Sequence, residues 1–364
     1  MAQNKLRPEG NARGLKTVLL ARFSALGDVA MTVPVVYSAC RSYPDVHFVF
    51  VTRPSMTSIF LDAPSNLTLV GVDLKTKYTG IGGLRTLVDE LVEEYRPEFF
   101  LDLHNVLRTK VMSVFLRLKG IPCHRIFKPR AKRRALTRRN NKVMLPLTSQ
   151  RARYREVFFK ADLGITEQFS GLFPGRCTAA VERFSAITAP KAKGEKWVGI
   201  APFAAHEGKV YPPEQMEKVV AMLAESDQNI RIFLFGGGGD ESTILGGWAE
   251  KYPRVTSLAG KKFGFPAELS LLNHLDVMLT MDSANMHLAA IALTPTVSIW
   301  GATHPYCGFK GWRQTEADTI QLPLSCRPCS VFGDKPCHRG DRLCLTAIKP
   351  QVIFNKLKEH LDKK

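Results

Sequence analysis

The residues best suited to chemistry stand in the segment Asp282-Ser-Ala-Asn-Met-His287. A buried-type strand is expected to end just before Asp282, and a helix is expected to begin just after it. Asp and Ser are preferred at a helix start because their side-chain oxygens accept from backbone N–H groups that lack a partner in the helix. Those N–H groups and the helix dipole also make a phosphate site. His287 lies one turn further along, where it can face the same ligand.

Two further loops follow predicted strands and offer groups to a nucleotide. In Gly236-Gly-Gly-Gly-Asp-Glu241 the glycines allow close backbone approach, and Glu241 can accept from ribose hydroxyls. The run lacks the Lys and Ser or Thr of a P-loop, so a tight turn between strand and helix explains it equally well. Lys209 could neutralise a diphosphate, or it could be a solvated loop lysine.

Near the start of the chain, Asp28 falls in the first helical turn after a strand. A carboxylate there either complements the helix dipole or takes a proton from an incoming hydroxyl. Ser24 precedes it in the same loop. His104 ends the fourth predicted strand and is either an acceptor contact or a structural histidine.

Four of the eight cysteines gather in the tail. In a cytosolic chain their spacing predicts a thiolate site for a structural Zn²⁺. The second two are not a Cys-x-x-Cys pair, so buried thiols or an adventitious disulfide stay open. The four are Cys326, Cys329, Cys337 and Cys344.

The formal charge of +18 is unevenly spread. No acidic residue lies between Asp102 and Glu156, whereas sixteen Lys or Arg lie in residues 108–155, with Arg133 and Arg134 in the densest stretch. Such a segment predicts a polyanionic partner: nucleic acid, an anionic membrane surface or a phosphorylated glycolipid. Few aromatic residues are interleaved, which disfavours a single-strand nucleic-acid platform.

Apolar runs alternate with helical patterns along the chain. This alternation predicts an α/β fold with doubly wound parallel sheets, and 364 residues predict two domains. The expected strands are 16–22, 47–51, 67–72 and 99–103, then 197–201, 230–235, 255–258, 277–281 and 296–300.

The expected division of the chain has five parts. They are a flexible N-terminus (1–14), an N-terminal Rossmann-like domain (15–175) that contains the basic segment (108–155), a linker (176–195), a C-terminal Rossmann-like domain (196–347) and a last helix (348–364). No convincing secretory signal or membrane span is present, so the protein is expected to be cytoplasmic.

Two stretches together resemble the signatures of glycosyltransferase family 9, the ADP-heptose:lipopolysaccharide heptosyltransferases. One is Arg22-Phe-Ser-Ala-Leu-Gly-Asp-Val-Ala-Met-Thr-Val-Pro34, and the other is Asp282-Ser-Ala-Asn-Met-His-Leu-Ala-Ala290 with Gly301-Ala-Thr303. The likeness extends through Leu258-Ala-Gly260 and the cysteine tail. It implies a GT-B fold, two Rossmann-like domains across a cleft, with the last helix crossing back towards the first domain.

The resemblance also implies roles. Asp28 matches the proposed general base of an inverting transfer, and no metal is required for catalysis. The residues that match donor-binding positions are Lys209, Glu241, Asp282, Ser283, Ala284 and His287. The acceptor-side candidates are Ser24, His104, Arg133 and Arg134. Many members carry Gly where Ala284 stands, and hydroxyl residues where Ala204 and Ala205 stand, so the donor nucleotide and sugar stay open.

The sequence thus predicts an enzyme that moves heptose from ADP-heptose to the Kdo- or heptose-bearing inner core of lipid A. It is expected to sit peripherally on the cytoplasmic face of the inner membrane, held by its basic segment, and to bind no nucleic acid. One alternative is a GT-B enzyme that uses or epimerises another nucleotide sugar. The other is a nucleic-acid-binding α/β protein that uses the basic segment.

Overall fold

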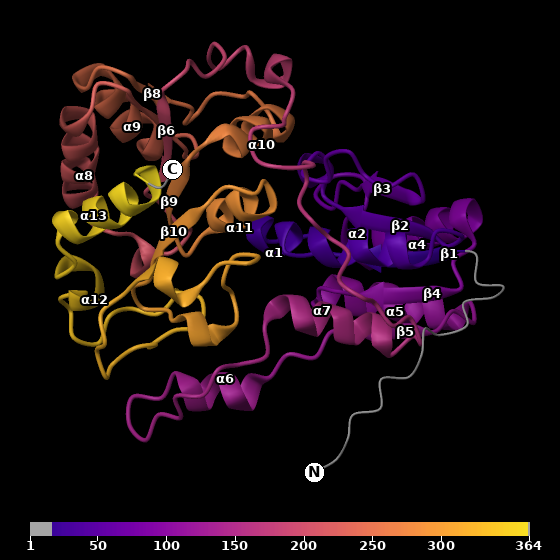
Figure 1. Cartoon of the computed structure of the whole chain (residues 1–364). Helices are drawn as coiled ribbons and strands as arrows, with labels where there is room; N and C mark the ends of the chain where they lie inside the picture. The colour runs from indigo at the N-terminus through magenta and orange to yellow at the C-terminus, as the bar shows by residue number, and fades with distance from the viewer. Residues whose placement is uncertain (1–16, 363–364) are drawn as a thin grey trace. The chain divides into compact units, whose positions relative to one another are not determined.

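The computed structural model describes residues 17–362, so the prediction for residues 1–14 lies outside the described part. Two compact units are present, each built on its own parallel sheet (Figure 1). Among the described residues, unit 1 comprises 17–128 and Gln150–Ser170, and unit 2 comprises Pro129–Ser149 and 171–362. Across residues 17–362, no helix is long and apolar enough to span a bilayer.

Unit 1 has five parallel strands in the order β3-β2-β1-β4-β5. The strands are β1 (Thr17–Ala21), β2 (His47–Thr52), β3 (Leu67–Gly71), β4 (Phe99–Asp102) and β5 (Cys123–Arg125). The helices are α1 (Leu26–Ala30), α2 (Val33–Ser42), α3 (Pro54–Thr57), α4 (Gly80–Tyr95), α5 (Leu107–Leu118) and α7 (Gln150–Phe159).

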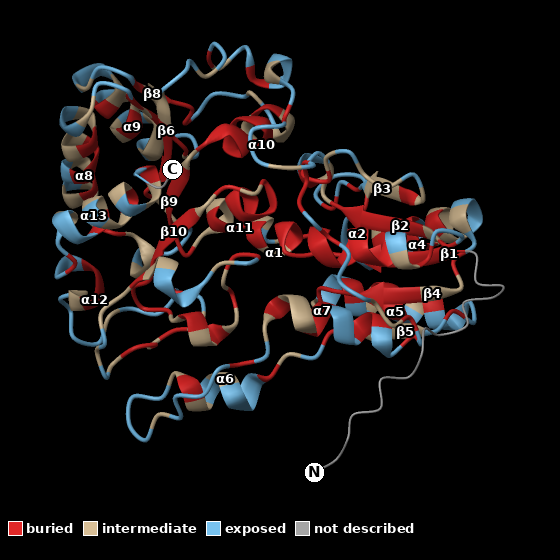
Figure 2. Cartoon of the chain, in the orientation of Figure 1, coloured by how far each residue is buried: buried red, intermediate tan, exposed pale blue. Residues whose placement is uncertain are grey.

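Burial explains why β1 reads as an uninterrupted apolar run. All five of its residues are buried, as is usual for a parallel strand covered by helices on both faces (Figure 2). On one face α4 buries Leu84, Leu87, Val88 and Leu91, a spacing that places them on one stripe of the helix. They share a core with residues of α5, while α2 contacts α7.

The order of the strands creates a binding position in unit 1. β1 pairs with β2 on one side and with β4 on the other, so the chain reverses its direction of winding between β1 and β4. In open α/β sheets, ligands bind beyond the carboxyl ends of the strands at such a switch point. The segments that follow these two strands begin at Arg22 and Leu103.

Unit 2 has six parallel strands in the order β11-β10-β9-β6-β7-β8. They are β6 (Lys196–Ala201), β7 (Ile230–Leu234), β8 (Val255–Ser257), β9 (Val277–Met281), β10 (Thr296–Ile299) and β11 (Thr319–Ile320). The α-helices are α6 (Arg130–Leu136), α8 (Pro213–Ser226), α9 (Asp240–Lys251), α10 (Phe265–His274), α11 (Ala284–Ile291), α12 (Leu343–Thr346) and α13 (Pro350–Leu361). Short 3₁₀ turns are Val181–Phe184, Glu207–Lys209, Pro305–Cys307 and Glu316–Asp318.

The switch point of unit 2 lies between β6 and β9, since β6 pairs with β7 on one side and β9 on the other. The loop after β6 ends in the turn Glu207–Lys209, and the loop after β9 leads into α11. The predicted nucleotide segments therefore meet at the position where an open sheet binds ligands.

The last helix, α13, buries Ile353, Leu357 and Leu361 in the core of unit 2, where it packs on α8. Its expected approach to the first domain stays a prediction, whereas two other segments group differently from the sequence-based division. Residues 176–195 were expected to be a linker, yet Phe184 is fully buried against Trp197. Residues 129–149 of the basic segment also group with unit 2.

Candidate active site

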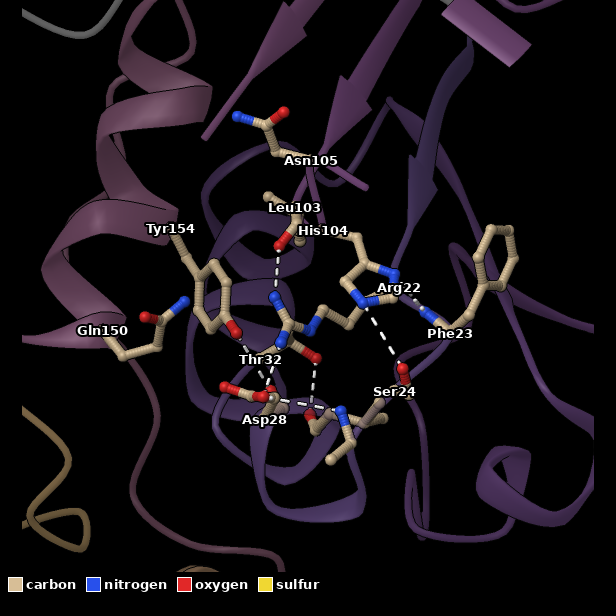
Figure 3. Close-up of polar contacts among 12 residues, drawn as sticks. Arg22, Phe23, Ser24, Asp28, Thr32, Leu103, His104, Asn105, Gln150 and Tyr154 are labelled. Atoms are coloured by element: carbon tan, nitrogen blue, oxygen red, sulfur yellow. Dashed lines mark hydrogen bonds and ion pairs between the residues drawn. The ribbon is translucent and has the colours of Figure 1, made fainter. Parts of the chain in front are cut away.

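Asp28 is held in place by the end of β1. It lies in the first turn of α1, and its Oδ2 forms an ion pair with Arg22 Nη2 at 2.6 Å (Figure 3). The N–H of Ala25 also donates to Oδ2, at 3.4 Å. Among the described residues both contacts of this carboxylate use Oδ2. The side chain is about a quarter exposed (24%), which gives a substrate access to it.

Arg22 is the organising residue of this site, and the sequence analysis did not select it. Its side chain is buried, with Nη1 donating to Leu103 O at 2.8 Å. Its guanidinium lies 5.8 Å from the ring centre of Tyr154, whose hydroxyl donates to Asp28 O at 3.2 Å. One arginine therefore ties together the segments after β1 and β4. Its place directly after a buried strand was the available signal.

His104 is kept neutral in the same site. Burial is the main cause that lowers its pKa to about 3, and the charges of Arg22, Lys128, Arg53 and Arg108 add to it. The N–H of Phe23 can only donate, so Nδ1 is the acceptor, at 3.4 Å, and the ring proton lies on Nε2. Nε2 then donates to Ser24 Oγ at 3.4 Å, which leaves the Ser24 hydroxyl proton for another acceptor.

The depressed pKa of His104 predicts a loss of stability in acid. In the unfolded chain the ring titrates near 6.5, so between pH 6.5 and about 3 the unfolded state binds more protons than the folded state. Stability therefore falls as the pH drops below 6.5, by about 2 kcal/mol at pH 5 from this group. His104→Asn keeps an acceptor for the Phe23 N–H but cannot titrate.

Urea unfolding at pH 7 and pH 5 measures this effect. The wild-type protein should lose about 2 kcal/mol more free energy of unfolding over this interval than the variant does. Equal losses in the two proteins would show that His104 does not carry the depressed pKa.

In unit 2 one predicted donor residue, Lys209, contacts the buried carboxylate of another, Asp282. Asp282 is 3% exposed, and its Oδ2 accepts from Lys209 Nζ at 2.9 Å and from Thr303 Oγ1 at 2.8 Å. The three residues come from the loops after β9, β6 and β10. Thr303 was part of the family-like segment but was not among the predicted site residues.

The start of α11 differs in detail from the expectation. Ser283 occupies the N-cap position, but its side chain makes no cap hydrogen bond and its Oγ contacts Thr280 Oγ1 at 3.2 Å instead. The Asp282 carboxylate is likewise engaged by Lys209 and Thr303. Neither side chain therefore caps the helix. Ala284 is the first helical residue and is half-buried, whereas His287 is buried in the second turn.

Glu241 lies in the first turn of α9 and holds the glycine loop. Its Oε2 accepts from the Gly237 N–H at 2.6 Å. A Cβ at Gly236 would lie 2.8 Å from Leu245 Cδ1, so this glycine also permits close packing of the helix. The structural explanation of the glycine run is thus correct in part, and the carboxylate stands at the end of β7 where the sequence predicted it.

The two arginines predicted on the acceptor side belong to unit 2. Arg133 lies on α6 with its guanidinium 5.3 Å from the ring centre of Phe332 and 6.0 Å from that of Phe309, whereas Arg134 is exposed. Lys142 Nζ donates to the carbonyls of Ser325, Cys326 and Pro328. These contacts attach residues 129–149 to unit 2, which explains why the segment departs from the predicted first domain.

The four tail cysteines share one pocket. Cys326, Cys329, Cys337 and Cys344 line a cavity of about 350 Å³, together with Arg327 and other polar side chains. Over residues 17–362, however, no group of three or more His, Cys, Asp or Glu side chains is arranged to hold a metal ion. The donor types suit zinc, but their arrangement is not that of a ligand set.

Comparisons with known proteins all point to the same protein family. The family model described as glycosyltransferase family 9 (heptosyltransferase) matches residues 92–335, more than half of the chain. Lipooligosaccharide heptosyltransferase 2 of Campylobacter jejuni is 26% identical over 173 residues, which span 46% of this chain and 52% of that protein. Lipopolysaccharide heptosyltransferase 3 of Escherichia coli is 22% identical over 299 residues, covering 81% of this chain and 85% of that protein.

Solved structures agree on the fold. A family 9 glycosyltransferase from Veillonella parvula superposes with a TM-score of 0.71 at 18% identity, covering 95% of this chain and 97% of that chain. The ADP-heptose lipopolysaccharide heptosyltransferase II of E. coli gives 0.68 at 18% identity, covering 95% and 98%. The predicted fold class is thereby confirmed. The chain belongs to glycosyltransferase family 9, the heptosyltransferases, and is a glycosyltransferase with the GT-B fold of two Rossmann-like domains.

Proposed function

We propose that this enzyme transfers heptose from ADP-heptose to the inner core of lipopolysaccharide, with inversion at the anomeric carbon. The observation that carries the proposal is the buried Lys209–Asp282–Thr303 cluster at the switch point of the unit 2 sheet. The names of the related proteins add the sugar and the acceptor class: they are lipopolysaccharide and lipooligosaccharide heptosyltransferases, and one structure is named for ADP-heptose.

In the proposed reaction Asp28 is the general base. It takes the proton of an acceptor hydroxyl, whose oxygen forms the new bond to the anomeric carbon while the bond from that carbon to the diphosphate breaks. ADP leaves with the bonding electron pair. Arg22 holds Oδ2 of Asp28, and the Ser24 hydroxyl, oriented by His104, is placed to donate to the acceptor sugar.

Positive charge at the leaving diphosphate would come from this chain's own groups. Lys209 Nζ is mostly buried beside Asp282, and the N–H groups at the start of α11 are not capped by Ser283. A cation and a helix N-terminus both stabilise an anion that gains charge in the transition state. Glu241 at the end of β7 is proposed to accept from the ribose, and His287 to contact the donor. The proposal needs no metal ion for catalysis.

Calorimetry with a nucleotide panel tests the donor. ADP-heptose and ADP should bind the wild-type protein, and UDP- and GDP-sugars should bind at least about tenfold more weakly. If the protein preferred another nucleotide, the assigned fold would stand but the proposed donor would be wrong. An assay without acceptor tests the epimerase alternative, because an epimerase would convert its nucleotide sugar unaided. Affinity for RNA or DNA without any for nucleotide sugars would overturn the proposal.

We also propose that the enzyme is a peripheral protein of the cytoplasmic membrane face and that α5 contacts the lipid. Leu107, Val114 and Leu118 are 78%, 53% and 78% exposed, and their spacing puts them on one face of α5. Arg108, Lys110 and Arg117 flank this ridge and are exposed. An apolar helix face bordered by basic residues is typical of helices that lie in an anionic membrane interface.

Substitution of the ridge tests its role in membrane binding. The triple variant Leu107→Ser/Val114→Ser/Leu118→Ser should bind phosphatidylglycerol–phosphatidylethanolamine vesicles at least about tenfold more weakly, since each buried methylene contributes about 0.8 kcal/mol. Ile81→Ser, at an exposed position of α4 (68%), is the matched control. Vesicle sedimentation measures both. If the triple variant and the wild type bound the vesicles equally, the membrane-binding surface would not include this face of α5.

The zinc prediction remains a proposal of its own. Four thiols in one pocket supply the donor chemistry, although the described arrangement is not a ligand set, and no catalytic step depends on the ion. Burial is the main cause that raises the pKa of Cys344 to about 11, so zinc binding would have to displace a proton there. Metal analysis of protein purified without chelator decides the question: about one Zn²⁺ per chain would support the zinc site, and the absence of zinc would show that the cysteines are reduced thiols.

A further inference from the structure

The cysteine tail contains a buried arginine with an unusual set of partners. Arg327 lies between Cys326 and Cys329, is 3% exposed, and directs its guanidinium at neutral oxygens. These are the carbonyls of Gly301 (2.5 Å from Nε), Leu322 (2.5 Å from Nη1), Trp300 (3.0 Å from Nη2) and Thr303 (2.9 Å from Nη2), with Gln321 Oε1 at 3.1 Å from Nη2.

Three of these carbonyls belong to the loop that carries Thr303. This loop follows β10, and Thr303 is itself fully buried, with its hydroxyl donating to Asp282 Oδ2 at 2.8 Å. A planar guanidinium fixes the directions of several acceptors at once, which a single ammonium group does not. Arg327 therefore fixes the orientation of the peptide groups on both sides of Gly301 and of the Thr303 carbonyl. Because the Thr303 hydroxyl donates to Asp282, Arg327 also helps to fix the position of the Asp282 carboxylate.

A second part of the tail lies directly on Lys209. Gly333 has a φ of +79°, and a Cβ there would lie 2.7 Å from Lys209 Cγ, so only glycine allows this contact. The turn is held by Ser330, whose Oγ accepts from the Gly333 N–H at 2.9 Å and donates to Asp334 Oδ1 at 2.5 Å. The Lys209 stem is thus confined by the tail backbone.

The three segments are also joined through their backbones. The Ala302 N–H donates to Gly208 O at 2.8 Å, and the Cys329 N–H donates to Ala302 O at 3.0 Å. A Cβ at Gly208 would lie 2.8 Å from Gly333 O, and a Cβ at Gly301 would lie 2.6 Å from Gly208 O. Glycines let the loops after β6 and β10 and the tail approach more closely than side chains would permit.

We propose that residues 326–334 position the donor-phosphate site, with Arg327 acting through Thr303 on Asp282 and Gly333 acting on Lys209. Both are positioning residues, because the contacts described for them run through neighbouring groups. The inference rests on the proposed function, in which Lys209 and Asp282 bind the donor. It gives the cysteine tail a role whether or not the thiols bind a metal, since the contacts come from Arg327 and from the backbone.

Arg327→Lys tests the first contact. Lysine keeps the charge but cannot reach the separate carbonyls with one ammonium group, so the affinity for ADP should fall roughly 10- to 100-fold. The KM for donor should rise while the KM for acceptor stays unchanged, a split that general destabilisation would not produce. Arg339→Lys is the matched control, because Arg339 is exposed and pairs with Asp341 in the same tail. Unchanged ADP affinity in a folded Arg327→Lys protein would overturn the inference for Arg327.

A double-mutant cycle tests the second contact. Gly333→Ala should weaken ADP binding in the wild-type background but should have little further effect when Lys209 is already Ala, because the Cγ, Cδ and Cε atoms that the new Cβ would displace are then absent. Equal effects of Gly333→Ala in both backgrounds would overturn the inference for Gly333. Failure of the wild-type protein to bind either ADP or ADP-heptose is a different result, which would overturn the proposed function and this inference with it.

Discussion

Asp28→Asn is expected to lower kcat for heptose transfer roughly 10²- to 10⁴-fold, the usual contribution of a general base. An amide keeps the shape of the side chain but cannot take the proton of the acceptor hydroxyl. Donor binding should be unchanged, because Asp28 belongs to unit 1 whereas the predicted donor residues belong to unit 2. Single-turnover transfer and ADP calorimetry on the same preparation measure the two quantities.

The ion pair with Arg22 requires a structural control for this variant. Arg22 is buried, so removal of the charge on Asp28 leaves its guanidinium with a weaker partner and can lower stability. Asp28→Glu restores the charge and should recover part of the activity if proton transfer is the function of this residue. Asp45→Asn, on an exposed turn of the same unit, is the matched surface control. Turnover near the wild-type rate in Asp28→Asn would remove it as the base.

Much of the fold could be predicted because parallel strands are buried on both faces. Such strands appear in the sequence as continuous apolar runs, and every predicted strand has an observed counterpart within one or two residues. The short strands β5 and β11 were missed, since segments of three and two residues are too short to form an apolar run. The packing of α13 on α8 could not be predicted, because the apolar stripe of a helix does not specify which partner it covers.

Residues of the candidate site could be predicted only where they lie in one short segment of the sequence. Asp282 and Ser283 directly follow β9, and Asp28 lies in the first helix after β1, so the local pattern was enough to select them as candidates. Arg22 and Tyr154 lie far apart in the chain and meet only after β1 and α7 pack in one unit. The role of Arg327 was likewise not predictable, because four of its five hydrogen-bond partners are main-chain carbonyls, which every residue type carries.

Lys209→Met is expected to weaken ADP binding by at least about tenfold. The variant removes a cation from the predicted diphosphate site and leaves the buried Asp282 carboxylate without its ion-pair partner. Loss of one member of a buried charge pair costs about 2–5 kcal/mol in binding, of which a large part is the penalty on the charge that remains. Calorimetry with ADP measures the loss, and Lys218→Met, an exposed-helix lysine of α8, is the matched control.

The double variant Lys209→Met/Asp282→Asn separates the two ways in which Lys209 could act. If Lys209 only neutralises Asp282, removal of both charges should restore ADP binding to near the wild-type level. If Lys209 binds the diphosphate itself, the double variant should regain only the affinity that Lys209→Met loses through repulsion between the unpaired Asp282 carboxylate and the ligand. Its affinity for ADP should then stay well below that of the wild type. We expect the second result, because Thr303 already satisfies Asp282 Oδ2 and the lysine can turn from that oxygen to the phosphate without leaving the carboxylate unpartnered. Full recovery would contradict direct phosphate binding by Lys209 and would show that the lysine acts only by neutralising the Asp282 carboxylate.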